Sequence, residues 1–184
     1  MDECLFPKPY ADRVARLRVA TGFALVAAFA WFSQPTISSL IWGLPVSALG
    51  LLLRAWATGH LEKNIRLAET GPYAYVRNPL YLGTALVAAG LVIASRRWLL
   101  AVLFAAVFIL IYLPVIELEE QHLRHLFPGF DAYAQRVPAL LPTLSAAKSD
   151  AGFRWALYVR NREYQALLGW LAGLALLVVK ILVL

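Results

Sequence analysis

Long stretches without charged side chains constrain this chain more than any other feature. Residues 19–53 contain none, and neither do 78–95 or 98–116, while 164–184 contains only Lys180. About 20 apolar residues are needed for a helix to cross the hydrocarbon core of a bilayer. Only 15% of all residues are charged, against about 25% in soluble domains, and 61% are hydrophobic. The sequence therefore predicts a polytopic membrane protein.

Pro35 and its polar neighbours divide the first run into two helices, because proline interrupts the hydrogen bonding of a helix. Only Arg96 and Arg97 separate the next two runs, which predicts a tight helical hairpin (79–95/97–118). We expect an all-α bundle of about five transmembrane helices that forms a single membrane domain over residues 1–184. The expected spans are 15–33, 37–58, 79–95, 97–118 and 164–184.

Sorting the charges by segment predicts the orientation. The segments 1–18, 59–78 and 117–163 carry thirteen of the 17 Lys and Arg residues and all 11 acidic ones, whereas the opposite loops carry two Arg. Basic loops face the cytoplasm, so we expect a multi-pass protein with a cytoplasmic N-terminus, in the plasma or inner membrane if the source is prokaryotic. The formal net charge of +6 then reflects orientation and not nucleic-acid binding. The lone Cys4 excludes an internal disulfide and a thiolate zinc site.

Nearly all chemistry must lie on the loops 59–78 and 117–163. In the first loop, Asn78 and Pro79 have the residue types of a helix cap and a first helical position. A helix start exposes free N–H groups and binds anions. Tyr73, Tyr75 and Tyr81 surround it, which also fits a plain interfacial aromatic belt.

Two groups of residues, one before and one after the predicted hairpin, share a recognisable spacing. They are Gly71, Tyr73, Arg77, Asn78, Pro79, Tyr81, Gly83, Glu119, Glu120, Leu123, Tyr133, Val137 and Pro138. Together they resemble the pattern G-x-Y-x-x-x-R-[HN]-P-x-Y-x-G, a helical hairpin, E-E-x-x-L, and Y-x-x-Y-x-x-x-V-P of a family of membrane methyltransferases, which includes isoprenylcysteine carboxyl methyltransferases and phospholipid N-methyltransferases. The resemblance covers about residues 40–142 and leaves 143–184 as a C-terminal extension with an extra transmembrane helix.

The resemblance implies that S-adenosylmethionine binds in a cytoplasmic cofactor-binding cap formed by these loops, next to the bilayer and without a Rossmann domain. From the histidine and cysteine count we expect no metal. Aromatic faces and a carboxylate suit a sulfonium cation, and methyl transfer depends mostly on positioning. The implied catalytic residues are Arg77, Glu119 and Glu120. The implied cofactor-binding residues are Ile65, Arg66, Leu67, Ala68, Tyr73, Asn78, Pro79, Leu80, Tyr81 and Glu119.

The acceptor stays open at this point, as a prenylated or lipid thiol, a carboxylate or a phospholipid amine. Carboxyl methyltransferases of this family resemble one another in a substrate-handling Arg four residues before the first motif glutamate, where this chain has Val115. Membrane lipids are expected partners, and Arg154, Arg160 and Arg162 in the extension could contact an anionic lipid or simply follow the positive-inside rule.

Other features of the chain allow four alternatives. The spacing of Glu119 and His122 matches half of a di-iron motif, but three histidines are too few for such a site. Gly169 and Gly173 form a G-x-x-x-G that could support a weak homodimer or pack within a monomer. An NADPH-dependent membrane sterol-type reductase shares part of the motif, and a non-catalytic membrane scaffold would keep the fold without the chemistry.

Overall fold

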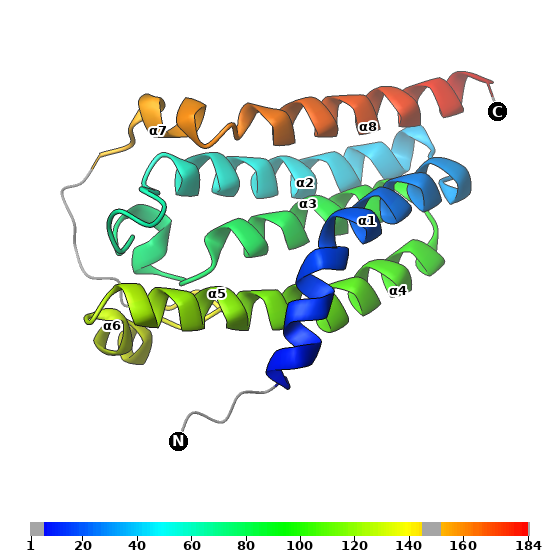
Figure 1. The fold of residues 1–184 in the computed structure, drawn as a ribbon. Helices are drawn as coiled ribbons and strands as arrows, with labels where there is room; N and C mark the ends of the chain where they lie inside the picture. The colour runs from blue at the N-terminus through cyan, green and yellow to red at the C-terminus, as the bar shows by residue number, and fades with distance from the viewer. Residues whose placement is uncertain (1–5, 145–151, 184) are drawn as a thin grey trace.

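The structure is a computed structural model that describes residues 6–144 and 152–183, and every regular element in these ranges is helical. Cys4 lies outside them. Figure 1 shows α2, α3, α8 and the α4–α5 segment running side by side, with α1 lying across one side of them. The elements are α1 (Lys8–Phe32), α2 (Ile37–Thr58), the 3₁₀ turn η1 (Gly71–Ala74), α3 (Pro79–Ser95), α4 (Trp98–Val107), the π-helical segment η2 (Phe108–Tyr112), α5 (Leu113–Leu126), α6 (Phe130–Arg136), α7 (Trp155–Arg160) and α8 (Tyr164–Val183).

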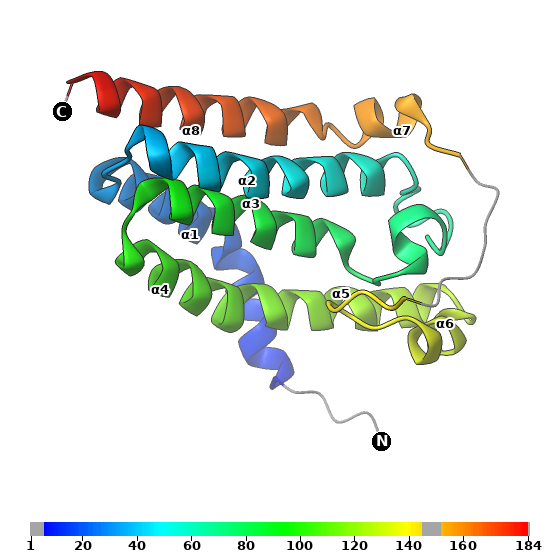
Figure 2. The same cartoon turned by 180° about the vertical axis from the view of Figure 1, so that it is seen from behind.

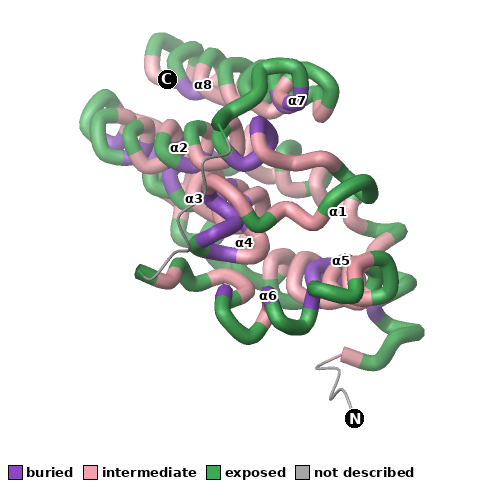
Figure 3. Tube along the Cα trace, turned by 90° about the vertical axis from the view of Figure 1, so that its left-hand side faces the viewer, coloured by how far each residue is buried: buried purple, intermediate pink, exposed green. Residues whose placement is uncertain are grey.

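The expected helical membrane bundle is confirmed. Four helices in the described ranges are long and apolar enough to cross a membrane: α1, α2, the continuous α4–η2–α5 helix, and α8. The fifth expected span, α3, has 17 residues and is about 26 Å long at 1.5 Å per residue, slightly less than a bilayer core. The chain packs little against the apolar stretches of α1 and α8, only 6% of which is buried, and Figure 3 shows both helices largely exposed. These two helices therefore present most of their surface to lipid.

Two helix boundaries differ from the expected ones. The first helix begins at Lys8 and not at residue 15, and the second helix of the hairpin continues to Leu126 and not to 118. Charged residues mark where a helix leaves the hydrocarbon core, and they do not end the helix itself. The consequence is that Glu119 and Glu120 lie on the helix α5 and not in a loop.

Glycines bring α2 and α3 into close backbone contact. A Cβ placed on Gly90 would lie 2.3 Å from the backbone nitrogen of Ser47, and one on Gly50 would lie 2.6 Å from the carbonyl oxygen of Gly83. Gly43 on α2 faces Gly90 on α3 in the same way, with its Cβ position 2.4 Å from the Gly90 oxygen. Small residues permit such approach between membrane helices. This contact fixes α3, and with it the motif residues at its start.

A π-helical turn interrupts the helix that leads to the glutamates. The Leu113 N–H bonds to the Phe108 oxygen five residues earlier, and Pro114 follows without an N–H of its own. The carbonyl of Leu110, which an N–H at position 114 would satisfy, instead accepts a 2.7 Å hydrogen bond from the Tyr10 hydroxyl on α1. The turn therefore joins α1 to the hairpin and sets the direction of Tyr112.

Candidate functional site

The two motif loops meet at one end of the bundle. The N–H groups of Arg77 and Asn78 donate to the carbonyls of Pro138 and Ala139 at 2.9 and 3.1 Å. The Tyr133 hydroxyl on α6 donates to the backbone oxygen of Tyr73 at 2.8 Å. Figure 2 shows the segment 137–144 turning back from α6, and the Thr143 N–H donates to the Tyr75 carbonyl at 2.9 Å. These bonds join residues about 60 positions apart into one layer, which we call the roof and define as η1, α6 and the segments 75–78 and 137–139.

Arg77 and Glu120 form the central ion pair of the roof. The Arg77 Nε and Nη2 atoms donate to the two Glu120 oxygens at 2.9 and 2.8 Å. Its Nη1 atom donates to the carbonyls of Ala134 and Val137 at 2.8 and 2.9 Å. The two side chains are only 15% and 17% exposed. Through these four bonds the Arg77 guanidinium connects α5 with α6 and the residue that follows it, and it keeps few donors for a ligand.

Asn78 lies at the N-cap position of α3, as expected, but its side chain makes no capping hydrogen bond. Its Nδ2 atom donates instead to Glu120 Oε1 at 2.7 Å and to the Ala139 carbonyl at 3.2 Å. The side chain is oriented by these two Nδ2 bonds, of which the one to the charged carboxylate is the stronger, and its Oδ1 atom accepts no bond from the start of α3. The first N–H groups of α3 are thus not used by this side chain.

Glu119, the next residue, has a different environment. Its Oε1 atom accepts a 2.9 Å hydrogen bond from the Tyr81 hydroxyl on α3. Arg18 on α1 approaches both, with Nη1 at 3.3 Å from the Tyr81 oxygen and 3.5 Å from Glu119 Oε1. Arg18 and Glu119 are 42% and 48% exposed, so this pair is weak and open to solvent or ligand. Sequence reasoning missed Arg18, because nothing in the motif spacing relates it to a residue 101 positions away.

Three tyrosines complete the polar end. Tyr112, from the π-helical turn, meets the ring of Tyr81 edge-on with a centroid distance of 5.9 Å. Tyr73 and Tyr133 are buried side chains of the roof itself, and burial raises the pKa of both phenols well above the ordinary value of 10.0. They therefore stay neutral and act as hydrogen-bonding and aromatic groups.

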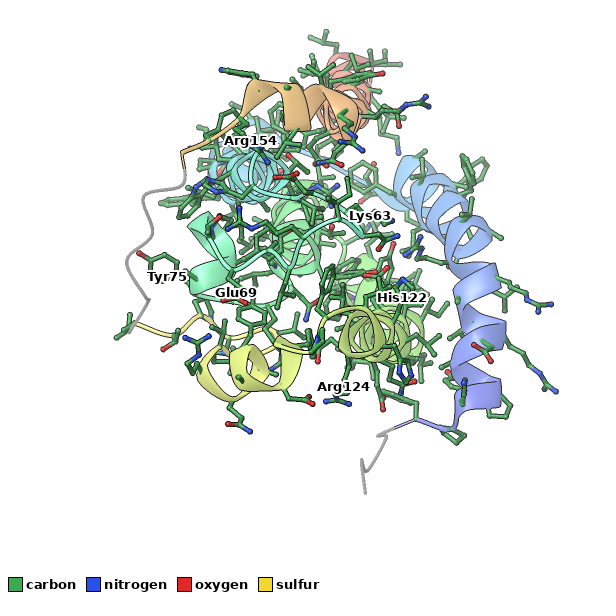
Figure 4. The ribbon with its side chains drawn as sticks, turned by 60° about the vertical axis from the view of Figure 1, so that its left-hand side comes forward. Lys63, Glu69, Tyr75, His122, Arg124 and Arg154 are labelled. Carbon is green, nitrogen blue, oxygen red and sulfur yellow. The ribbon has the colours of Figure 1, made fainter. Side chains whose placement is uncertain are left out.

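A cavity of about 1490 Å³ joins this polar end to the apolar helices. In Figure 4, Lys63 and His122 lie on the side that faces α1, whereas Glu69 and Tyr75 lie near η1. Among the expected site residues, Ile65 does not line the cavity and its side chain is 58% exposed. The expected residues that do line it are Arg66, Leu67, Ala68, Tyr73, Arg77, Asn78, Pro79, Leu80, Tyr81, Glu119 and Glu120.

The far wall of the cavity is apolar. Gly22, Val26 and Phe29 of α1 line it together with Gly169 and Gly173 of α8. The α8 glycines, in which we expected a helix-packing motif, have no neighbouring atom within 4 Å of the position that a Cβ would occupy. Within the described chain they border open space, and the packing glycines are those of α2 and α3. A homodimer through Gly169 and Gly173 stays a prediction.

The C-terminal extension holds the loop that lines the other side of the polar end. Asn161 donates to the carbonyls of Thr58 and Leu61 at 3.1 and 3.0 Å, and Arg154 pairs with Glu62. Glu163, only 8% exposed, accepts bonds of 2.6 and 3.1 Å from Arg54, whose guanidinium also reaches α3 through Thr84. Arg154 thus has a carboxylate partner, and the extension positions the loop 59–68.

The metal alternative gains no support. The residues that the structure describes contain no group of three or more His, Cys, Asp or Glu side chains that could hold a metal ion. His60 bonds to Thr70 through Nδ1 at 3.1 Å, and its pKa is lowered by burial and by the charge of Arg154. His122 lines the main cavity beside Glu119.

The apolar helices and the cavity that the roof covers are those of an integral membrane protein, and the motif residues gather at this cavity. The family model for phospholipid methyltransferases matches residues 17–129. The chain therefore belongs to the phospholipid methyltransferase family, within the superfamily of integral membrane methyltransferases that the sequence resembles.

Two curated relatives carry names from metal resistance. The chain is 33% identical over 125 residues to the nickel-cobalt-cadmium resistance protein NccN of Alcaligenes xylosoxydans xylosoxydans, a match that covers 67% of this chain and 57% of the relative. It is 30% identical over 151 residues to the cobalt-zinc-cadmium resistance protein CzcN of Cupriavidus metallidurans, a match that covers 80% of this chain and 68% of the relative. No solved structure matches significantly.

Proposed function

We propose that this chain transfers a methyl group from S-adenosylmethionine to an acceptor that enters the site from the bilayer. The observation that carries the proposal is the continuous cavity of about 1490 Å³ that runs from the motif residues to an apolar wall between α1 and α8. Typical small-molecule sites measure about 300–1,000 Å³. A larger cavity, polar at one end and apolar along the rest, suits a polar cofactor together with a lipidic acceptor.

The polar end fits the cofactor chemically. When bound, S-adenosylmethionine supplies an electrophilic methyl group on a sulfonium sulfur. The Glu119 carboxylate and the rings of Tyr81 and Tyr112 form an anionic, aromatic surface of the kind that attracts such a cation. Lys63 and Arg66 line the same end and suit the cofactor's own carboxylate.

The residues of the expected catalytic trio then have different roles. Glu119 would contact the cofactor, whereas Arg77 and Glu120 would position the roof, because their charges already satisfy each other and the backbone of α6. The roof keeps water from the reacting groups and the cavity aligns them, which is most of what methyl transfer requires.

The acceptor is proposed as a membrane lipid or lipidated molecule with a thiol, carboxylate or amine group. The family description names phospholipids, and the relatives are named for resistance to nickel, cobalt, zinc and cadmium. Methylation of a membrane component that alters the response to metals would account for both the family description and the names of the relatives. The cytoplasmic position of the site, predicted from the charge distribution, would give it access to cytoplasmic S-adenosylmethionine.

Ligand titration of the purified full chain in detergent tests this proposal against the two alternatives. We expect saturable binding of S-adenosylmethionine and S-adenosylhomocysteine, measured by calorimetry, and no binding of NADPH. Binding of NADPH alone would support the reductase and overturn the proposal. Binding of none of the three would favour a non-catalytic scaffold.

A further inference from the structure

The adjacent glutamates Glu119 and Glu120 differ in how firmly they are bound to their partners. Glu120 is held by two short bonds from Arg77 and one from Asn78, in side chains that are about one-sixth exposed. Glu119 meets its guanidinium partner, Arg18, at 3.5 Å, and both side chains are nearly half exposed. A pair with this distance and exposure is easily exchanged for another partner.

Arg18 also marks the beginning of the apolar wall. Gly22, Val26 and Phe29 follow it at intervals of four, four and three residues, which places them on one face of α1. All four residues line the same cavity. A lipid lying along this face would place its acyl chains against Val26 and Phe29 and its head group against the Arg18 guanidinium.

The charges at the polar end favour an anionic head group. Arg18, Lys63 and Arg66 line this end, while Glu120 is already neutralised by Arg77. Figure 4 shows Lys63 on the side of the site that faces α1. When Lys63 and Arg66 pair with the carboxylate of the cofactor and Glu119 pairs with its sulfonium, Arg18 is left as the cation that can meet a phosphate or carboxylate arriving from the bilayer.

We propose that Arg18 exchanges partners during binding, pairing with Glu119 in the ligand-free protein and with the anionic head group of a lipid when a sulfonium cation occupies its place at Glu119. The cofactor and the lipid then assist each other, because each removes a competitor of the other. This inference rests on the proposed function, since it requires a cationic cofactor at Glu119.

The test is a linkage experiment on the full chain in an uncharged maltoside detergent. The affinity for S-adenosylmethionine is measured alone, with dioleoyl phosphatidylglycerol, with dioleoylglycerol, which has the same acyl chains and no phosphate, and with inorganic phosphate. We expect phosphatidylglycerol to tighten cofactor binding about five- to tenfold, within the range of ordinary coupling between sites, and dioleoylglycerol to have no effect. An equal effect of inorganic phosphate would identify a free anion, and not a lipid, as the ligand of Arg18 and would overturn the lipid assignment.

Variants locate the effect. In Arg18→Gln we expect tighter binding of S-adenosylmethionine without lipid, no further response to phosphatidylglycerol, and unchanged binding of the uncharged thioether S-adenosylhomocysteine. Arg18→Lys should keep the lipid response. Arg16→Gln is the matched control, because it removes the same charge from an exposed position of α1 that does not line the cavity.

The outcomes separate the two proposals. If the wild type does not bind S-adenosylmethionine at all, the proposed function fails. If it binds the cofactor and phosphatidylglycerol changes nothing, or if Arg18→Gln responds to the lipid as the wild type does, the exchange of Arg18 is refuted while the methyltransferase proposal stands.

Discussion

Replacing each of two neighbouring glutamates by glutamine should produce opposite phenotypes. Glu120→Gln removes a charge that accepts bonds of 2.8 and 2.9 Å from Arg77 and one of 2.7 Å from Asn78. The Glu120 side chain is 17% exposed and that of Arg77 is 15% exposed. Breaking a buried pair by removing one charge costs about 3–5 kcal/mol. Because glutamine keeps one carbonyl acceptor, we expect a loss near the lower limit, about 3 kcal/mol.

Glu119→Gln should hardly change stability. Its guanidinium partner lies at 3.5 Å and is 42% exposed, and such pairs contribute about 1 kcal/mol or less. The variant should nevertheless lose affinity for S-adenosylmethionine, because the neutral amide no longer attracts a sulfonium cation. Binding of S-adenosylhomocysteine, which lacks that charge, should change much less.

The assay combines unfolding and binding on the same preparations. Denaturant titration in detergent, followed by the fluorescence of the 6 Trp residues, gives the change in free energy of unfolding. Calorimetric titration gives the affinity for both ligands. Equal losses of stability in the two variants, or full cofactor affinity in Glu119→Gln, would refute the division of roles between the two glutamates.

Three further predictions concern helix packing, the C-terminal extension and pH. Gly90→Ala should destabilise the fold by about 1–3 kcal/mol, because its Cβ would lie 2.3 Å from the α2 backbone, whereas Gly169→Ala, with nothing within 4 Å, should be neutral or stabilising in the same unfolding assay. Asn161→Ala loses two hydrogen bonds to the end of α2 and the loop that follows it, and should weaken cofactor binding with little change in helicity, measured by calorimetry and circular dichroism. The pKa of His60 is lowered in the fold, so the native state binds that proton less readily than the unfolded chain does. The free energy of unfolding should therefore fall as the pH drops below 6.5. His60→Asn should reduce this pH dependence, measured by denaturant titration between about pH 5 and about pH 7.5.

The spans could be predicted from the sequence because burial in lipid excludes charges. The start of α3 at Pro79 and its end at Ser95 coincide with the expected hairpin, since proline and the Arg96–Arg97 pair mark both limits. The extension of α5 to Leu126 could not be predicted in this way, because charge reports exit from the membrane and not the end of helical hydrogen bonding.

The site was predictable where its residues are close to the motifs and not where the fold alone unites them. The sequence led to Tyr81 and Glu119 through the family pattern, and the structure places them 2.9 Å apart. Arg18 joins the site from α1, and Glu163, in the turn between α7 and α8, supports it through Arg54. No local pattern in the sequence marks either residue. The side chain of Asn78 departs from its expected capping role, because its Nδ2 bonds to Glu120 and to the Ala139 carbonyl orient it toward α5 and the segment 137–139.

The proposed function depends on methyl transfer to a lipid-phase acceptor from a cofactor held at Glu119. Membranes that contain the wild type or Glu119→Gln are incubated with S-adenosylmethionine labelled in its methyl group, and the label extracted into organic solvent is measured. We expect labelled lipid or lipidated product with the wild type and little with Glu119→Gln. Equal label in the two membranes, or none with a wild type that binds the cofactor, would refute methyl transfer at this site.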